Sequence, residues 1–221
     1  MSQYPGFFLA FEGLDGAGKS TQVAMLSADL VQRGFKVTTV RPSDTNLGEL
    51  VRGFLLQHQM DQPIESWSEV LLFIAGRVQL LREVIVPALE RGEVVIADRY
   101  AHSTLAYQGG GRGLSVEELR HLHTVMCHDL WPDLTVLLDI PLRVAQVRQR
   151  TQDLPIDRIE SAPDTFHAAV QATFEKFASD PAEHIVKVDG GQGASEVAKA
   201  VAEVVVPVLL EHRTHSPVGM R

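Results

Sequence analysis

The segment "FEGLDGAGKS", residues 11–20, has residue types and spacing suited to binding phosphate. Gly13, Gly18, Lys19 and Ser20 fit the pattern G-x-x-x-x-G-K-[ST]. In such a loop backbone N–H groups surround the phosphates, the lysine neutralises them and the hydroxyl binds Mg²⁺. The flanking residues read as a buried strand before the loop and a helix after it, which is the expected context. The loop therefore predicts a nucleotide phosphate site rather than a turn with a chance Gly-Lys pair.

Asp15 is an unexpected residue in this loop, because a carboxylate repels the phosphates that the loop should attract. One interpretation is that Asp15 merely forms an Asx-type turn.

A second group of chemical residues follows the apolar stretch "VVIAD", residues 94–98. Asp98 could orient Mg²⁺ or its waters and Arg99 could hold a second phosphate, although a structural ion pair is the alternative. The next stretch, "STLAYQGGGRG" (103–113), is too glycine-rich for a helix interior and is predicted to be a substrate-facing loop. A flexible connector is the alternative.

Two further segments carry candidates for nucleotide contacts. Phe73 and Arg77 are four residues apart on a predicted helix, so they could stack on and hydrogen-bond a pyrimidine, or else be a core phenylalanine and a surface arginine. The polar stretch 147–160 holds Arg148, Arg150 and Arg158, which could close over a triphosphate or belong to a solvated helix end.

The elements that must position these residues alternate along the chain. Short apolar stretches predict buried strands at 7–11, 36–40, 94–98, 134–139 and 184–189. Helical patterns separate them, at 47–58, 66–91, 115–128, 142–150, 164–179 and 195–212. This order predicts an α/β fold with a parallel sheet covered on both faces, and ligands beyond the carboxyl ends of its strands.

The length and composition of the chain indicate its number of domains, its partners and its cellular compartment. The 221 residues predict one domain over 1–213 and a flexible tail over 214–221. The net charge of −8 argues against binding to polymeric nucleic acid. The single cysteine, Cys127, and the lack of a long apolar run lead us to expect a cytoplasmic protein with no membrane partner.

Taken together, the motifs resemble those of the thymidylate kinases in the P-loop nucleoside-monophosphate kinase superfamily. The marks are "FEGLDGAGKST", "EVLLFIAGRVQ", "DRYAHSTLAYQGGGRG", "PDLTVLLD" and "DRIE", in the family's order. The resemblance implies a three-layer P-loop fold with a five-stranded parallel sheet. It also implies Mg²⁺ as cofactor, ATP and dTMP as small-molecule substrates, phosphoryl transfer between them, and a homodimer.

The resemblance also implies roles for individual residues. Asp15 would face the sugar 3′-hydroxyl and the cation shell of the acceptor, Phe73 would stack on thymine, Arg77 would contact the edge of the base, and Arg99 would hold the acceptor phosphate. The predicted catalytic residues are Lys19, Asp15, Arg99, Arg150 and Arg158, and the predicted metal site comprises Ser20 and Asp98. The predicted ATP site comprises Gly13, Leu14, Asp15, Gly16, Ala17, Gly18, Lys19, Ser20, Thr21 and Arg148. The predicted acceptor site comprises Asp15, Arg41, Phe73, Arg77, Arg99, Ser103, Thr104, Tyr107 and Gln108.

The chain departs from the family pattern after its second strand. There the family has an R-E-P-G-G-T-like segment, whereas this chain has "VRPSDTNLGEL" (40–50). Pro42 and Thr45 align, so the usual phosphate-binding arginine falls at Val40 and Arg41 is an uncertain replacement. The phosphate loop also lacks a basic residue at Gly16, and the lid expected at about 148–160 must supply that charge through Arg150 or Arg158, while Arg148 could stack on adenine.

Two other functions are compatible with the phosphate loop. A deoxynucleoside kinase would need a carboxylate base near the end of the second strand, where this chain has Arg41. A non-catalytic nucleotide-binding protein would not need Lys19, Ser20, Asp98 and Arg99 together. A GTPase-like switch would need an N-K-x-D motif, which the sequence lacks.

Overall fold

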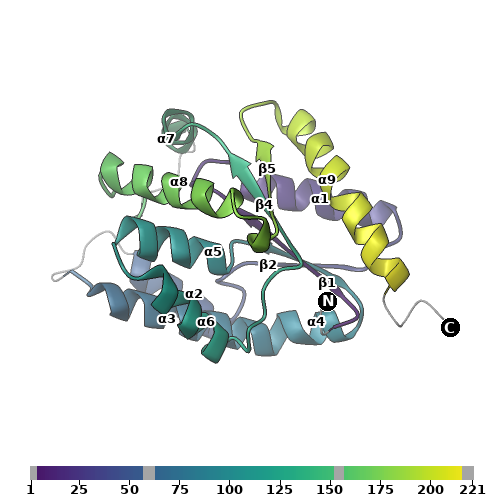
Figure 1. The fold of residues 1–221 in the computed structure, drawn as a ribbon, viewed down its shortest axis with the longest axis horizontal. Helices are drawn as coiled ribbons and strands as arrows, with labels where there is room; N and C mark the ends of the chain where they lie inside the picture. Colours follow the sequence, from purple (N-terminus) through teal and green to yellow (C-terminus); the bar gives the residue numbers. More distant parts are fainter. Residues whose placement is uncertain (1–3, 57–62, 152–156, 216–221) are drawn as a thin grey trace.

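The computed structural model describes residues 4–56, 63–151 and 157–215, and within them the chain is an α/β protein (Figure 1). Five parallel strands form one sheet in the order β2-β3-β1-β4-β5. This confirms the fold class expected from the alternating strand and helix patterns. The strands are β1 Phe7–Glu12, β2 Val37–Val40, β3 Val94–Asp98, β4 Leu134–Asp139 and β5 Ile185–Asp189.

The predicted helices are present with small shifts at their ends, whereas α5 was not predicted; residues 57 and 58 of the helix predicted over 47–58 lie outside the described residues. The stretch predicted as one helix over 66–91 is a continuous helical run, in which the π-helical turn η1, Leu81–Ile85, separates α3 from α4. The helices are α1 Lys19–Gln32, α2 Asn46–Leu56, α3 Ser66–Leu80, α4 Val86–Glu90, α5 Ala101–Thr104, α6 Val116–Met126, α7 Leu142–Thr151, α8 Asp164–Ala178 and α9 Ala194–His215. α9 extends to His215, so the first two residues of the tail predicted over 214–221 are helical, and residues 216–221 lie outside the described residues.

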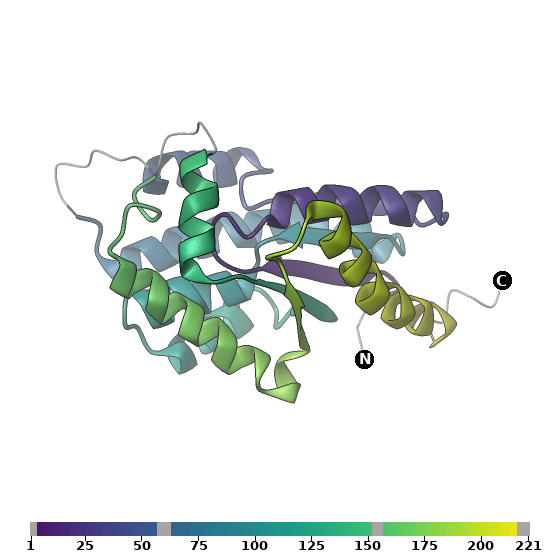
Figure 2. The same ribbon diagram turned by 90° about the horizontal axis from the view of Figure 1, so that it is seen from above.

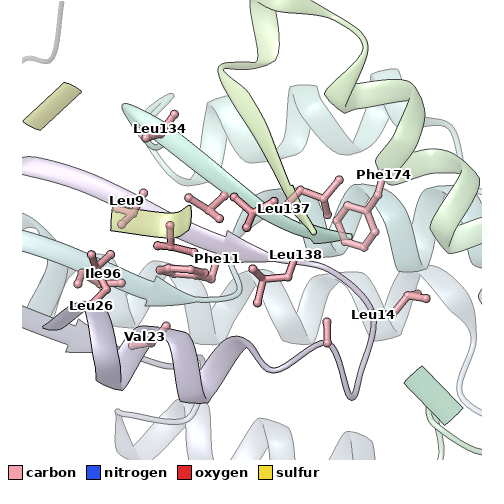
Figure 3. Close-up of a cluster of buried hydrophobic side chains, with 14 of the residues drawn as sticks. Leu9, Phe11, Leu14, Val23, Leu26, Ile96, Leu134, Leu137, Leu138 and Phe174 are labelled. Carbon is pink, nitrogen blue, oxygen red and sulfur yellow. The ribbon is translucent and has the colours of Figure 1, made fainter. Parts of the chain in front are cut away.

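Both faces of the central strand β1 are covered, which explains its unbroken apolar sequence. Phe7, Leu9 and Phe11 pack into a cluster with residues of α1 and α9, the two helices seen side by side in Figure 2. Figure 3 shows part of this cluster, where Val23 and Leu26 of α1 lie beneath the sheet. The alternate residues of β1, Phe8 and Ala10, pack on the opposite face with residues of η1 and α4.

The glycine-rich stretch 103–113 is helical, so its prediction as a loop was wrong. α5 continues into a π-helical turn, η2, over Leu105–Gly111. The glycines serve packing, because α8 lies directly against this turn. A Cβ atom on Gly110 would lie 2.1 Å from Thr173 Oγ1, and one on Gly111 would lie 2.3 Å from a ring carbon of Phe166. Glycine was read as a helix breaker, but close contact with α8 requires it here.

The strand register places the two chemical segments side by side. Phe11 of β1 pairs with Asp98 of β3, so the phosphate loop and Arg99 leave neighbouring strands at the same edge of the sheet. In the described part of the chain, no helix combines the length and the apolar character needed to cross a membrane.

Candidate active site

The phosphate loop connects β1 to α1 and depends on glycine for its shape. Gly13 and Gly16 have φ angles of 135° and 83°, which residues with a side chain rarely adopt. A Cβ atom on Gly16 would also lie 2.5 Å from the carbonyl oxygen of Ala145. The loop can therefore bring its N–H groups close to a ligand at the N-terminus of α1, where the helix dipole favours an anion.

Lys19 is buried at the start of α1. Its Nζ atom donates to the carbonyl oxygens of Leu14, at 2.7 Å, and Gly13, at 3.2 Å. Burial, together with the positive charge of Arg99, lowers the pKa of Lys19 to about 8, although Asp15 opposes the shift. The ammonium group is thus held inside the loop, and its charge is sensitive to pH above neutrality.

Ser20 and Asp98 meet across the edge of the sheet. The Ser20 hydroxyl donates to Asp98 Oδ2 at 2.5 Å, and the Asp98 side chain is buried at the end of β3. A hydroxyl and a carboxylate oxygen are the kinds of ligand that Mg²⁺ prefers. The chemistry of this pair therefore fits the metal site expected from the sequence.

Asp15, the unexpected carboxylate of the phosphate loop, forms an ion pair with Arg99. Arg99 donates to one carboxylate oxygen, and the Tyr107 hydroxyl donates to the other at 2.7 Å. Although burial alone would raise the pKa of Asp15, the charges of Arg99 and Lys19 hold it well below its ordinary value. The carboxylate therefore stays ionised and orients Arg99 and Tyr107.

The backbone at Arg99 is held in a conformation that is uncommon for a residue with a side chain, with φ of 76°. Glu12, a fully buried carboxylate at the end of β1, supports this turn. It accepts hydrogen bonds from the backbone N–H groups of Tyr100, at 2.8 Å, and Ser103, at 3.1 Å. The sequence analysis missed Glu12, although an acidic residue ending an otherwise apolar strand was a signal.

A cavity of about 140 Å³ opens beside Asp15 and Arg99. It lies between the carboxyl ends of the strands and helices α2, α3 and α5, with the turn 157–160 forming another wall. Eight of the nine predicted acceptor-site residues line it: Asp15, Phe73, Arg77, Arg99, Ser103, Thr104, Tyr107 and Gln108.

Arg77 reaches this cavity from α3 with one half of its guanidinium already engaged. Its Nη2 atom donates to Thr104 Oγ1 at 2.6 Å and to the carbonyl oxygen of Tyr100 at 3.0 Å. Its Nη1 atom is buried and has no hydrogen-bond partner in the described part of the chain. A buried donor without a partner is costly, so this geometry suits an acceptor oxygen on a bound molecule.

Arg41 is the predicted acceptor-site residue that is missing from the described cavity lining. Its side chain is exposed, and its backbone N–H donates to Asp44 in a turn after β2. Arg52 of α2 lines the cavity instead, a residue that the sequence analysis missed. It lies one turn after Gly48, which also lines the cavity, and no local sequence pattern marked it.

The three arginines of the predicted lid lie in different surroundings, and residues 152–156 of that lid are outside the described residues. Arg148 donates to the carbonyl oxygens of Gly190 and Gly191, after β5. Arg150 is exposed at the end of α7. Arg158 is engaged by Glu69 of α3 and by the carbonyl oxygen of Leu55, at 2.9 Å. Arg158 is therefore held by the protein itself, whereas the Arg150 side chain faces solvent.

The chain is similar to known proteins over most of its length. The family model described as "Thymidylate kinase" matches residues 11–201. A thymidylate kinase of Thermomicrobium roseum is 42% identical over 208 residues, which cover 94% of this chain and 98% of the relative. A thymidylate kinase of Cereibacter sphaeroides is 43% identical over 212 residues, which cover 93% of this chain and 97% of the relative. A thymidylate kinase of Nitrosomonas eutropha is 43% identical over 202 residues, which cover 90% of this chain and 92% of the relative. The chain therefore belongs to the thymidylate kinase family.

Proposed function

We propose that the chain transfers the γ-phosphoryl group of ATP to dTMP, giving dTDP and ADP. The observation that carries this proposal is the ion pair between Asp15 of the phosphate loop and Arg99, which stands at the wall of the neighbouring cavity. The pair joins a triphosphate site to a second pocket with an arginine suited to another phosphate. Such a two-site arrangement fits a transferase better than a protein that only binds one nucleotide.

The reaction needs positioning and charge neutralisation more than proton transfer. The phosphate of dTMP is already an anion at neutral pH, so it can attack without a general base. Lys19 would neutralise the donor phosphates, and Arg99 would align the acceptor phosphate and reduce the repulsion between the two anions. Mg²⁺, held partly through Ser20 and Asp98, would supply a further positive charge on the ATP phosphates.

The walls of the cavity supply contacts for the rest of dTMP. Phe73 would stack on thymine, and the free Nη1 of Arg77 would donate to a carbonyl oxygen of the base. Asp15 and Tyr107 would face the deoxyribose, with Ser103, Thr104 and Gln108 completing the pocket. In place of Arg41, we propose Arg52 as the additional arginine for the acceptor phosphate.

We assign the remaining charge on the transferred group to Arg150. Arg148 would contact the adenine side of ATP, since its guanidinium lies against the loop after β5. Arg150 is exposed and forms no ion pair with the residues that the structure describes, so it is available to a bound triphosphate. The lid expected at about 148–160 would also exclude water and limit hydrolysis of ATP.

A phosphotransfer panel tests the activity. With ATP and Mg²⁺, dTMP should be phosphorylated faster than dUMP, dCMP, dGMP, UMP or thymidine, as measured by ADP release. Faster phosphorylation of thymidine than of dTMP would show a deoxynucleoside kinase instead. ATP binding without acceptor-dependent turnover would show a non-catalytic nucleotide-binding protein.

We also propose that the chain works as a homodimer in the cytoplasm. Large apolar side chains are exposed on several helices, including Leu47, Leu50 and Phe54 on α2, Leu71 and Val78 on α3, and Val125 and Met126 on α6. These three helices are neighbours, because α3 contacts both α2 and α6. A second copy that covers these side chains would remove this apolar surface from water. The buried free thiol of Cys127 suits a reducing compartment.

A further inference from the structure

Glu69 is a buried carboxylate beside the cavity, and the phosphoryl transfer described above gives it no role. Its side chain is only 1% exposed, in the first turn of α3. It lies one turn before Phe73 and two turns before Arg77, two of the α3 residues that line the cavity. A buried charge is retained at little cost only when it is paired and hydrogen-bonded, so the partners of Glu69 indicate what it does.

Each oxygen of Glu69 holds a different part of the cavity wall. Oε1 accepts a hydrogen bond from Gln108 Nε2 at 2.7 Å. Oε2 accepts one from the guanidinium of Arg158, while Arg112 lies farther away, at 3.5 Å. Burial alone would raise the pKa of Glu69, but the hydrogen bonds from Arg158 and Gln108 lower it, so the group is an anion at neutral pH.

Arg158 anchors the turn 157–160 to the ends of two helices. Its Nε atom donates to the carbonyl oxygen of Leu55, in the last turn of α2. A cation at the C-terminus of one helix and an anion at the N-terminus of the next both agree with the helix dipoles. The same turn carries Asp157, Ile159 and Glu160, which line the cavity, so the Glu69–Arg158 ion pair holds that wall in place.

The hydrogen bond between Gln108 and Glu69 fixes which way the side-chain amide of Gln108 points. An ionised carboxylate only accepts hydrogen bonds, so Gln108 must turn its NH₂ group towards Glu69. The carbonyl oxygen of a planar amide then points away from Glu69. Because Gln108 lines the cavity, this carbonyl oxygen is the group that it offers to a ligand, as a hydrogen-bond acceptor. Thymine has an N–H donor at N3, whereas the N3 atom of cytosine is itself an acceptor.

We propose that Glu69 is a positioning residue of the acceptor site, which fixes the Gln108 amide with one oxygen and the Arg158 turn with the other. This inference rests on the proposed function, because it assigns the cavity to a pyrimidine monophosphate. Glu69 acts on dTMP affinity and on the choice between thymine and cytosine, without touching the substrate. Arg158 acts on the acceptor wall rather than on the transferred phosphoryl group.

The first test uses Glu69→Gln, which keeps the size of the side chain and removes its charge. The KM for dTMP should rise at least about tenfold, since a hydrogen bond to a charged group is lost, while the KM for ATP stays within about twofold. The ratio of kcat/KM for dTMP to that for dCMP should fall, because an amide at position 69 can also donate and no longer fixes Gln108. An unchanged dTMP KM together with an unchanged ratio would overturn the proposal.

Glu183→Gln is the matched control. Glu183 is also a partly buried carboxylate held by an arginine, Arg120, and by His102, but it does not line the cavity. Both variants should melt at a lower temperature than the wild type. Only Glu69→Gln should change the KM for dTMP, and an equal change in both would reduce Glu69 to a structural role.

Arg158→Met provides a second variant should Glu69→Gln fail to fold, because the Arg158 side chain is 20% exposed. It should raise the KM for dTMP and leave the single-turnover rate at saturating substrates near that of the wild type. A large fall in that rate with unchanged dTMP binding would place Arg158 on the phosphoryl group and overturn the inference. A wild-type chain without dTMP-dependent ATP turnover would instead refute the proposed function itself.

Discussion

At the scale of single residues, the site is a small network of charges in which each group holds another. Asp15 orients Arg99 and Tyr107, Glu12 holds the turn that carries Arg99, and Lys19 lies among the carbonyl groups of the loop. The carboxylate in the phosphate loop is therefore part of the connection between the proposed donor and acceptor sites. Its ionised state persists at neutral pH because its pKa is lowered.

The pH dependence of ATP use should report Lys19. Its pKa of about 8 means that the active, protonated form is lost as the pH rises through that value. The kcat/KM for ATP, measured from pH 6 to 10, should therefore fall above about pH 8. Lys19→Arg should show lower activity with no alkaline fall over this range, since a guanidinium does not titrate there. An unaltered alkaline fall in this variant would assign the titration to another group.

A second prediction at this scale compares Arg52 with Arg41. Arg52→Met should raise the KM for dTMP by about tenfold to a hundredfold, as expected for the loss of about 1.5–3 kcal/mol from a hydrogen bond to a charged phosphate. Arg41→Met should change it less than about twofold, because the Arg41 side chain is exposed away from the described cavity lining. Steady-state kinetics with dTMP varied at saturating ATP measures both. The reverse ranking would restore Arg41 as the phosphate ligand.

At the scale of the elements, the segment after β3 positions much of the acceptor site. α5 and η2 carry Ser103, Thr104, Tyr107 and Gln108 to the cavity from one continuous helical stretch. The π-helical turn ends in three glycines, of which Gly110 and Gly111 let α8 pack against it. The positions of these side chains therefore depend on how closely α8 approaches η2.

Gly110→Ala should test this contact. The new methyl group would lie 2.1 Å from Thr173 Oγ1 and 3.0 Å from the carbonyl oxygen of Ala169, so η2 and α8 would have to separate. We expect a loss of about 1–3 kcal/mol in the free energy of unfolding, measured in urea, and weaker dTMP binding. Gly53→Ala is the control, since a Cβ atom there meets nothing within 4 Å and the substitution should stabilise α2 by up to about 1 kcal/mol. A Gly110→Ala variant as stable as the wild type would show that the contact adjusts freely.

At the scale of the whole molecule, the parallel sheet brings the two nucleotide sites to one edge. The order β2-β3-β1-β4-β5 places the ends of β1 and β3 side by side, and the phosphate loop and Arg99 follow those ends. The cavity lies in the same region, between this edge and helices α2, α3 and α5. Away from the cavity, α2, α3 and α6 expose the apolar side chains that we assign to a dimer contact.

The dimer should depend on α2. Phe54 and Leu50 are 49% and 72% exposed, so replacing both with glutamate should cost the monomer little and place charges in the contact. Light scattering after size exclusion should give twice the chain mass for the wild type and the chain mass for the double variant. Leu210→Glu on α9, a residue 48% exposed, is the control and should leave the mass unchanged. A monomeric wild type would refute the dimer.

The sequence by itself determined the features that lie in contiguous segments. The phosphate loop, the apolar strands and the helical periodicities were predicted from local patterns, because the loop's glycines, lysine and hydroxyl act within ten residues. The eight cavity residues were found through their motifs, whose order along the chain resembles that of a known family.

The tertiary structure decided what depends on residues far apart in the chain. Glu69 meets Gln108 and Arg158 across 39 and 89 positions, and no local pattern predicts such pairs. Arg52 faces the cavity only because α2 packs against α3, which sets the direction of each helix face. Gly110 and Gly111 of η2 show the same limit. Local propensity makes glycine a helix breaker, yet the close approach of α8 makes it the residue that this helical turn can accommodate.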